Sequence, residues 1–280
     1  MTIIKAKPHA WKVALPMYRI SPQLAEDYDA FLQAFIATLQ RDGFNDPIEI
    51  VATGDDLMTW WRRPDVLLTQ SCGYPFITSL HDQVQLIATP SFNVAGCVGG
   101  LYSSVFVTHI DQQSRVQILA DARGGIAVIN QADSNSGMNV LRYAVSSLTR
   151  TDESFFSAVK TSGAHLRSLA MIRDKAADIA AIDCVTFAYA QEHCPELTQS
   201  IHIIGQSVAT SALPLIASNS VAPDVIKLIQ ASLKELLITQ KALLARLHIA
   251  DFIETTVDDY ASILALETAL SARGRTVMHW

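Results

Sequence analysis

The sequence lacks the usual signatures of catalysis. It has no GxSxG nucleophile turn, no HExxH zinc motif, no GxGxxG dinucleotide loop and no GxxxxGK[ST] phosphate loop. The eight histidines are scattered without metal-ligand spacing. A metal cluster of His193, Cys194, Asp183 and Cys184 is conceivable, but nothing in their spacing along the sequence indicates that these side chains converge. The sequence therefore predicts no catalytic residues, no metal site and no cofactor.

Positive charge and long apolar runs are also scarce. The chain has 21 Lys and Arg against 27 Asp and Glu, a net charge of -6, which argues against general nucleic-acid binding. No run approaches the roughly 20 apolar residues needed to span a bilayer, so membrane insertion is not expected. The N-terminus MTIIKAKPHAWKVALPM has no apolar stretch of signal-peptide length. As written, the sequence predicts a cytoplasmic protein, unless a leader has been removed.

Cysteine is rare, and none of the four residues forms a CxxC pair, which disfavours a structural zinc site. Cys72 and Cys97 each lie beside a glycine-containing bend. They could meet as a disulfide in an oxidising compartment. Buried free thiols are the simpler alternative.

Half of the 280 residues are hydrophobic, enough for a sizeable core, and their spacing indicates the elements. Short apolar runs predict strands at 11–17, 48–52, 66–70, 84–90, 102–109, 125–130, 178–183, 201–207 and 213–218, with 48–52 and 66–70 buried. Amphipathic spacing predicts helices at 24–40, 55–61, 136–148, 164–173, 184–192, 223–237, 239–249 and 257–271. Strands alternating with helices imply an α/β fold with largely parallel sheets.

No linker composition marks a domain boundary. The extended runs at 102–109 and 201–207 are candidates for two crossings between lobes. One lobe would then be discontinuous, 1–105 plus 206–280, and the other would be 106–205. The three C-terminal helical segments would cover the first lobe or mediate a dimer.

The stretch DSNSGMNVLRYAV, 133–145, contains the most informative junction. It joins the strand GIAVIN to a helix, at the carboxyl end of a strand where α/β proteins bind ligands. A helix start has unpaired N–H groups and a dipole that favours an anion. Ser134, Asn135 and Ser136 add side-chain donors, and Gly137 allows close approach. The alternative is plain helix capping by Asp133, Ser134 or Ser136.

Further candidates are single residues at similar junctions. His165 begins a helix in TSGAHLRSL and could donate to an oxyanion, and Asp183 ends the strand DIAAID. Tyr74 and Tyr102 lie in the glycine-containing turns QSCGYPF and GCVGGLYSS, where a phenolic hydroxyl can be a ligand donor. Capping or structural roles are at least equally good alternatives for each of them.

In their order, these junctions resemble a known family. QSCGYPF, TPSFNVAGCVGGLYSSVFVTH, LADARGGIAVINQADSNSGMNVLR and TSGAHLRSLAMIRDKAADIAAID follow one another as in the phosphonate- and phosphate-type substrate-binding proteins of ABC importers. The resemblance covers roughly 11 to 220.

The resemblance implies a type II periplasmic-binding-protein fold, with two α/β lobes of mostly parallel sheets joined by two hinge strands. It implies a small oxyanion ligand, such as a phosphonate or phosphate ester, and an ABC importer permease as partner. It also implies that the protein is periplasmic. Ser134, Asn135, Ser136 and Gly137 would hold the oxyanion, with Tyr102 donating from the hinge. His165 would touch the anion, Asp183 would lie at the cleft floor, and Tyr74 would reach from the first lobe.

Three hypotheses follow. The first is a binding protein that closes around its oxyanion by a hinge motion. The second is a cytoplasmic enzyme of cofactor biosynthesis on the same fold, with His165 and Asp183 as the acid–base pair. The third is a ligand sensor with an unnamed partner.

Overall fold

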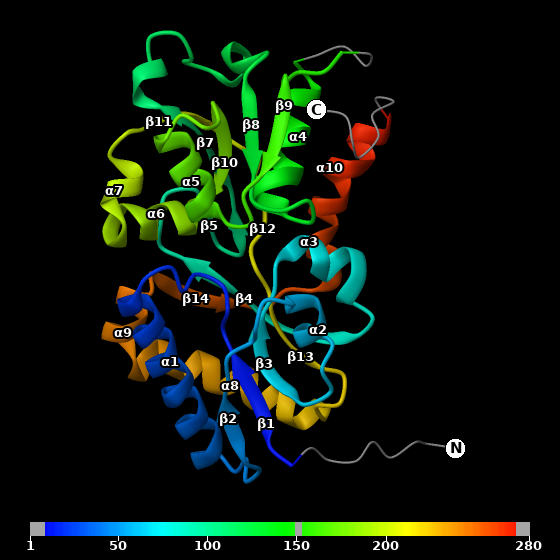
Figure 1. Cartoon of the computed structure of the whole chain (residues 1–280). Helices are drawn as coiled ribbons and strands as arrows, with labels where there is room; N and C mark the ends of the chain where they lie inside the picture. The colour runs from blue at the N-terminus through cyan, green and yellow to red at the C-terminus, as the bar shows by residue number, and fades with distance from the viewer. Residues whose placement is uncertain (1–8, 149–152, 273–280) are drawn as a thin grey trace. The chain divides into compact units, whose positions relative to one another are not determined.

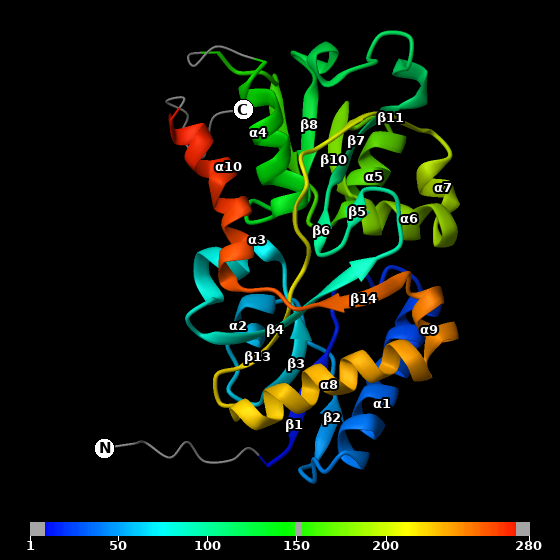
Figure 2. The same cartoon turned by 180° about the vertical axis from the view of Figure 1, so that it is seen from behind.

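The computed structural model describes residues 9–148 and 153–272, which form two compact units. Unit 1 contains the chain up to Asn93 together with Ala212–Val257. Unit 2 contains Val94–Ser211 and the chain from Asp258 onward. Each unit is an α/β structure built on a sheet of its own, shown in Figures 1 and 2. This confirms the predicted α/β class.

Unit 1 is built on a six-stranded sheet of order β14-β4-β13-β3-β1-β2. Its strands are β1 (Trp11–Ala14), β2 (Ile48–Ile50), β3 (Val66–Gln70), β4 (Val84–Phe92), β13 (Leu215–Ser218) and β14 (Ile249–Ile253). Its helices are α1 (Pro22–Arg41), α2 (Leu57–Trp61), α3 (Gly73–Pro75), the π-helical turn Phe76–Leu80, α8 (Pro223–Thr239) and α9 (Lys241–Arg246).

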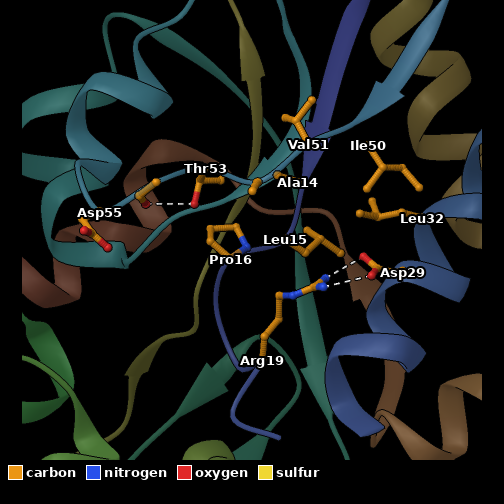
Figure 3. A pocket seen from close by; sticks show the side chains of 12 residues that line it. Ala14, Leu15, Pro16, Arg19, Asp29, Leu32, Ile50, Val51, Thr53 and Asp55 are labelled. Carbon is orange, nitrogen blue, oxygen red and sulfur yellow. Dashed lines mark hydrogen bonds and ion pairs between the residues drawn. The ribbon is translucent and has the colours of Figure 1, made fainter. Parts of the chain in front are cut away.

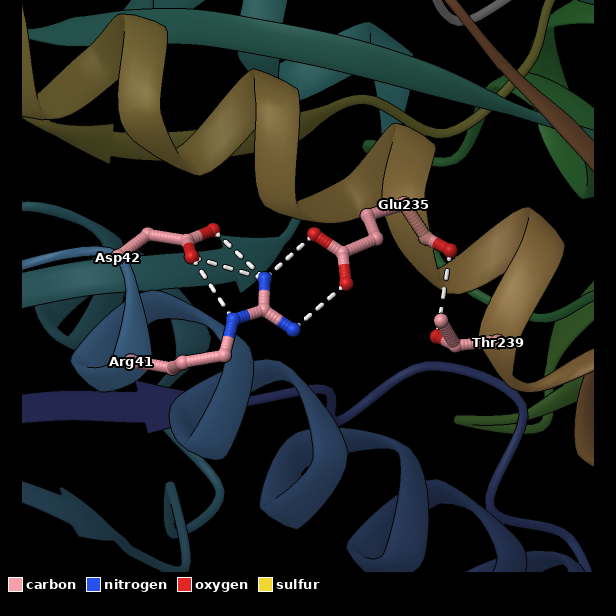
Figure 4. Close-up of polar contacts among 4 residues, drawn as sticks. All are labelled: Arg41, Asp42, Glu235 and Thr239. Atoms are coloured by element: carbon pink, nitrogen blue, oxygen red, sulfur yellow. Dashed lines mark hydrogen bonds and ion pairs between the residues drawn. The ribbon is translucent and has the colours of Figure 1, made fainter.

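Helix α1 shows how the sequence specifies one of these elements. Ser21 caps it by accepting from the Leu24 N–H at 3.2 Å, and Pro22 occupies the first turn, where its missing N–H costs nothing. The predicted apolar stripe is buried, and α1 packs against α8 and α9. At its end Arg41 pairs with Asp42 and with Glu235 of α8, as Figure 4 shows. These exposed ion pairs orient the two helices but stabilise them little.

Unit 2 is built on a five-stranded sheet of order β11-β7-β10-β8-β9 and a small sheet of order β12-β6-β5. Its strands are β5 (Cys97–Val98), β6 (Leu101–Tyr102), β7 (Ser104–His109), β8 (Ile126–Ile129), β9 (Ala158–Thr161), β10 (Ile179–Asp183), β11 (Ile201–Gln206) and β12 (Thr210–Ser211). Its α-helices are α4 (Val140–Ser146), α5 (His165–Arg173), α6 (Cys184–His193), α7 (Pro195–Thr198) and α10 (Ala261–Ala272). It also has short helical turns of the 3-10 type at Ile110–Gln112, Leu119–Ala122 and Val257–Tyr260, and a π-helical turn at Asn135–Asn139.

Helices cover both faces of the unit 2 sheet. In Figures 1 and 2, α4 and α10 lie on one side, and α5, α6 and α7 lie on the other. The buried Arg142 of α4 donates to Glu267 of α10 at 3.3 Å. In the described part of the chain, no helix is both long enough and apolar enough to cross a bilayer.

The sheets are mixed rather than mostly parallel as predicted. In unit 1, β1 pairs parallel with β2 and β3, whereas β13 and β14 run antiparallel to their neighbours. In unit 2, β10 pairs parallel with β8 but antiparallel with β7. Strands joined by a helical crossover run parallel. The strands β7 and β13 begin after the chain has passed into a unit from the other one, and no single crossover helix joins either of them to the strands beside it. The strand β14 is parallel to β13, to which α8 and α9 connect it.

The predicted connections between lobes are also wrong. The runs 102–109 and 201–207 contain β7 and β11, which are antiparallel neighbours inside unit 2. Among the described residues the chain passes between units at three points, after Asn93, Ser211 and Val257. The predicted division therefore differs from the observed one at 94–105, at 206–211 and in α10.

The burial predicted for residues 48–52 is wrong, and the strands β9 and β14 are absent from the predicted strands. Residues 48–52 were expected to be buried, but β2 is the edge strand of its sheet and is largely exposed. The strand β14 was missed because it lies between the segments 239–249 and 257–271, which were both predicted to be helical. Pairing with β4, a contact distant in sequence, makes Ile249–Ile253 a strand.

Candidate functional site

The helix start at 134–137 ends the loop that follows β8. Ser134 caps it, because its Oγ accepts from the Gly137 N–H at 3.1 Å. Asp133 is exposed to solvent. The capping interpretation thus holds for Ser134. This cap gives an acceptor to one backbone N–H of the turn, that of Gly137, and does not reach the N–H groups before it.

Two of those donors are unpaired. The backbone N–H groups of Asn135 and Ser136 have no acceptor among the described residues, although both residues are buried. A buried N–H without an acceptor costs free energy, so nearly all such groups in proteins are paired with protein, water or ligand. The Oγ of Ser136 lies on the same turn. Three donors that an anion can use are therefore concentrated within two residues.

His165 is directly linked to this turn. It begins α5, and its Nε2 lies 2.9 Å from the Oγ of Ser136. Burial lowers the pKa of His165 to about 4, so the imidazole is neutral at pH 7. Its Nδ1 is buried and has no hydrogen-bond partner in the described part of the chain. The structure thus brings together Ser136 and His165, which are 29 residues apart.

The side chain of Asn135 has a different role. It is fully buried, and its Nδ2 donates to the Tyr102 hydroxyl at 3.3 Å and to the Thr210 Oγ1 at 2.8 Å. Its Oδ1 accepts from Asn139 at 3.1 Å. Asn139 also donates to the carbonyl of Ile263 at 3.2 Å. The Asn135 amide is therefore occupied by protein partners, and it joins the helix start to β6 and β12.

Gly137 also differs from its expected use. A Cβ at this position would stand 1.8 Å from the Oδ1 of Asn130. The close approach that requires glycine is therefore made by the Asn130 side chain of this same unit. The predicted role of Gly137 in holding a ligand is not tested by this contact.

Asp183 ends β10 and caps α6. Its Oδ1 accepts from the N–H groups of Val185 and Thr186 at 2.7 and 2.9 Å. This is the capping alternative that the sequence left open. A ligand contact of Asp183 remains a prediction.

Tyr74 belongs to unit 1, in the short helix α3 that follows β3, and its side chain is part-exposed. Its carbonyl accepts from the Thr78 hydroxyl at 2.8 Å. The predicted contact of Tyr74 with a ligand is not tested by any of these observations.

Unit 1 has a candidate pocket of its own, which the sequence did not indicate. A cavity of about 550 Å³ opens beyond the carboxyl ends of the parallel strands β1 and β2, beside Leu15, Pro16 and Val51 (Figure 3). The guanidinium of Arg19 and the carboxylate of Asp29 face each other there at 2.8 and 3.0 Å. Because the two charges compensate, this cavity has no net attraction for an anion.

No group of three His, Cys, Asp or Glu residues converges on a possible metal position within residues 9–148 and 153–272. Cys72 and Cys97, for which a disulfide was one of two alternatives, are not joined by a disulfide in the structure. The Sγ of Cys97 lies instead 3.4 Å from that of Cys184.

Comparison with known proteins now decides the family. The model of the periplasmic substrate-binding proteins of phosphonate ABC transporters matches residues 63–260, more than half of the chain. The chain belongs to this family. This substrate-binding protein has no match among curated protein sequences.

Solved structures share its fold. PhnD1 from Prochlorococcus marinus, solved in complex with methylphosphonate, superposes with a TM-score of 0.75 at 17% identity, covering 95% of this chain and 99% of that one. A binding protein component of a Pseudomonas aeruginosa ABC phosphonate transporter gives 0.76 at 16% identity, covering 95% and 87%. A Xanthomonas citri protein bound to ATP gives 0.68 at 12% identity, covering 95% and 98%.

The family establishes the general role. Its members are periplasmic substrate-binding proteins of ABC transporters. The predicted family, two-lobed α/β fold and solute-binding role of this chain are confirmed. Sequence reasoning missed Thr210 and Asn139. The spacing of Asn135 and Asn139, one helical turn apart, was a usable signal for the second, whereas nothing local marks Thr210.

Proposed function

We propose that this substrate-binding protein binds a small oxyanion, a phosphonate or phosphate ester, at the start of the helix that contains Ser136. The observation that carries the proposal is the pair of backbone N–H groups of the buried residues Asn135 and Ser136, which have no acceptor within residues 9–148 and 153–272. An oxyanion accepts from both groups and removes the cost of leaving them unpaired.

His165 determines which way the Ser136 hydroxyl points. A neutral imidazole has one N–H, and placing it on Nε2 makes His165 the donor to Ser136 Oγ. The hydroxyl hydrogen of Ser136 is then directed at the ligand. The oxyanion is therefore held by neutral donors and the helix dipole, without a formal positive charge from His165.

Tyr102 supports this arrangement from β6 through its contact with Asn135. Asn135 donates to the phenolic oxygen of Tyr102, which orients the ring beside the helix start. Tyr102 contributes a donor to the ligand in this proposal, while the amide of Asn135 positions the turn. The protein delivers its ligand to the permease of an ABC importer.

Isothermal titration calorimetry tests the proposal with methylphosphonate, a phosphate monoester and sulfate. Ser136→Ala removes a hydrogen bond to a charged group, so affinity for the phosphonate or ester is expected to fall about 10- to 100-fold. Ser147→Ala is the matched control, because Ser147 is an exposed serine that follows the last residue of α4, at the other end from Ser136.

Two results would overturn the proposal. One is the absence of binding below millimolar concentration for every oxyanion in the panel. The other is equal affinity of Ser136→Ala and Ser147→Ala. Turnover of the ester during the titration would instead favour an enzyme.

A further inference from the structure

Two of the four cysteines meet in unit 2. Cys97 begins β5 and Cys184 begins α6, 87 residues later, and their Sγ atoms are 3.4 Å apart. Both are free thiols in the structure, and Cys184 is buried. The two thiols come from elements distant in sequence, so tertiary packing alone brings them together.

The backbone holds them in place. The Cys184 N–H donates to the carbonyl of Ser103 at 3.1 Å, and the Ser103 N–H donates to the carbonyl of Gly96 at 2.9 Å. A Cβ built on Gly96 would lie 3.0 Å from the Cβ of Cys184, so the chain before Cys97 passes directly over Cys184. A disulfide needs sulfurs about 2.05 Å apart, so rotation of the two side chains would have to bring the sulfurs closer than the present 3.4 Å.

We propose that Cys97 and Cys184 form an intramolecular disulfide when the protein is in an oxidising compartment. The family to which the chain belongs is periplasmic, and disulfides persist there. This inference is independent of the ligand proposed above, because neither thiol is among the proposed ligand contacts.

The chemistry is thiol–disulfide exchange with a disulfide-bearing oxidant. One cysteine loses its proton and attacks the oxidant, forming a mixed disulfide and releasing one oxidant thiolate. The second cysteine loses its proton and displaces the other oxidant sulfur. The protein loses two protons and two electrons, and the oxidant is reduced to two thiol groups.

The bond would cross-link two parts of the unit. Cys97 is the register partner of Tyr102 in the β5–β6 hairpin, and Cys184 follows Asp183 at the start of α6. The disulfide would therefore fasten the strand that contains Tyr102 to the helix that Asp183 caps. The hydrogen bond with Cys184, together with burial, raises the pKa of Cys97, so oxidation is expected to be faster at alkaline than at neutral pH.

Mass spectrometry tests the bond. The full-length protein is equilibrated at pH 8.5 with oxidised glutathione, unfolded in the presence of an alkylating agent, and digested without reductant. The expected result is a linked pair of peptides containing Cys97 and Cys184, with Cys72 and Cys194 alkylated. Alkylation of all four cysteines, a Cys72–Cys97 link, or glutathione alone on Cys97 would overturn the inference.

Thermal unfolding gives a second readout. The bond closes a long loop, so reduction is expected to lower the Tm by on the order of 10 °C. The double variant Cys97→Ser, Cys184→Ser should show no such response to reductant. An equal response in the variant and in the natural protein would contradict the assignment, and so would a Tm that reductant leaves unchanged in the natural protein.

Discussion

Replacement of Asn135 by alanine is the most informative perturbation of the unit 2 site. The Asn135 amide makes hydrogen bonds to Tyr102, Thr210 and Asn139 at 3.3, 2.8 and 3.1 Å, and all four residues are buried. A typical intramolecular hydrogen bond contributes about 1 kcal/mol, and a buried polar group left unpaired costs about 1–3 kcal/mol. Asn135→Ala is therefore expected to lower the free energy of unfolding by about 3–4 kcal/mol.

Urea unfolding followed by circular dichroism measures this loss. Thr210→Val is the matched variant, because it removes only the 2.8 Å bond and keeps the shape of the side chain. Its expected cost is about 1–2 kcal/mol. The double variant should then be less destabilised than the sum of the two single variants, with a coupling energy of about 1 kcal/mol.

Two results would refute this reasoning. A loss below about 1 kcal/mol for Asn135→Ala would mean that the network is not intact in solution. Strict additivity of Asn135→Ala and Thr210→Val would mean that the two side chains do not interact. In either case the assignment of Asn135 as a positioning residue fails, and direct contact with a ligand becomes the better interpretation.

Three further predictions concern unit 2. Glu267→Ala removes the carboxylate that accepts from the buried Arg142 at 3.3 Å, so urea unfolding should show a loss of about 2–3 kcal/mol, whereas Glu267→Gln keeps an acceptor oxygen and should lose less. The pKa of His165 is lowered from 6.5 to about 4 in the folded protein, so between these two pH values the unfolded chain binds a proton at His165 and the folded chain does not. The free energy of unfolding is therefore expected to fall as the pH falls from about 6.5 to 4, by at most about 3 kcal/mol. His165→Gln should remove this part of the pH dependence of unfolding, and an unchanged pH profile would contradict the burial of the imidazole. Gly137→Ala places a Cβ 1.8 Å from the Oδ1 of Asn130, so calorimetric unfolding should show a loss of about 1–3 kcal/mol, and an unchanged Tm would mean that Asn130 moves aside without cost.

Local patterns were enough to predict most elements. Helix α1 follows its apolar stripe and its Ser-Pro start, and β3 coincides with the run 66–70. The failures have a common cause. Residues 249–253 form a strand by pairing with β4, which is distant in sequence, and β2 lies exposed at the edge of its sheet. Pairing partners and edge positions depend on contacts that a local window does not contain.

The candidate site shows the same division. The small polar residues at 134–136 and the histidine at 165 are visible as helix starts after strands, and parallel β8 and β9 lead to neighbouring helix starts. The sequence did not distinguish whether each of these residues caps a helix, positions another side chain or binds a ligand. Ser134 and Asp183 cap, Asn135 bridges β6 and β12, and Ser136 pairs with His165.

The sequence by itself determined the class of fold and the family, and it predicted the helix start at which we propose that an anion binds, because periodicity, capping residues and motif order can be read along the chain. Only the tertiary structure decided which donors stay unpaired at that helix start, that the Asn135 amide is occupied, and that Cys97 meets Cys184 rather than Cys72. Asn135 and Thr210 are 75 residues apart and the two thiols are 87 residues apart, and the packing of β-strands and helices brings them together.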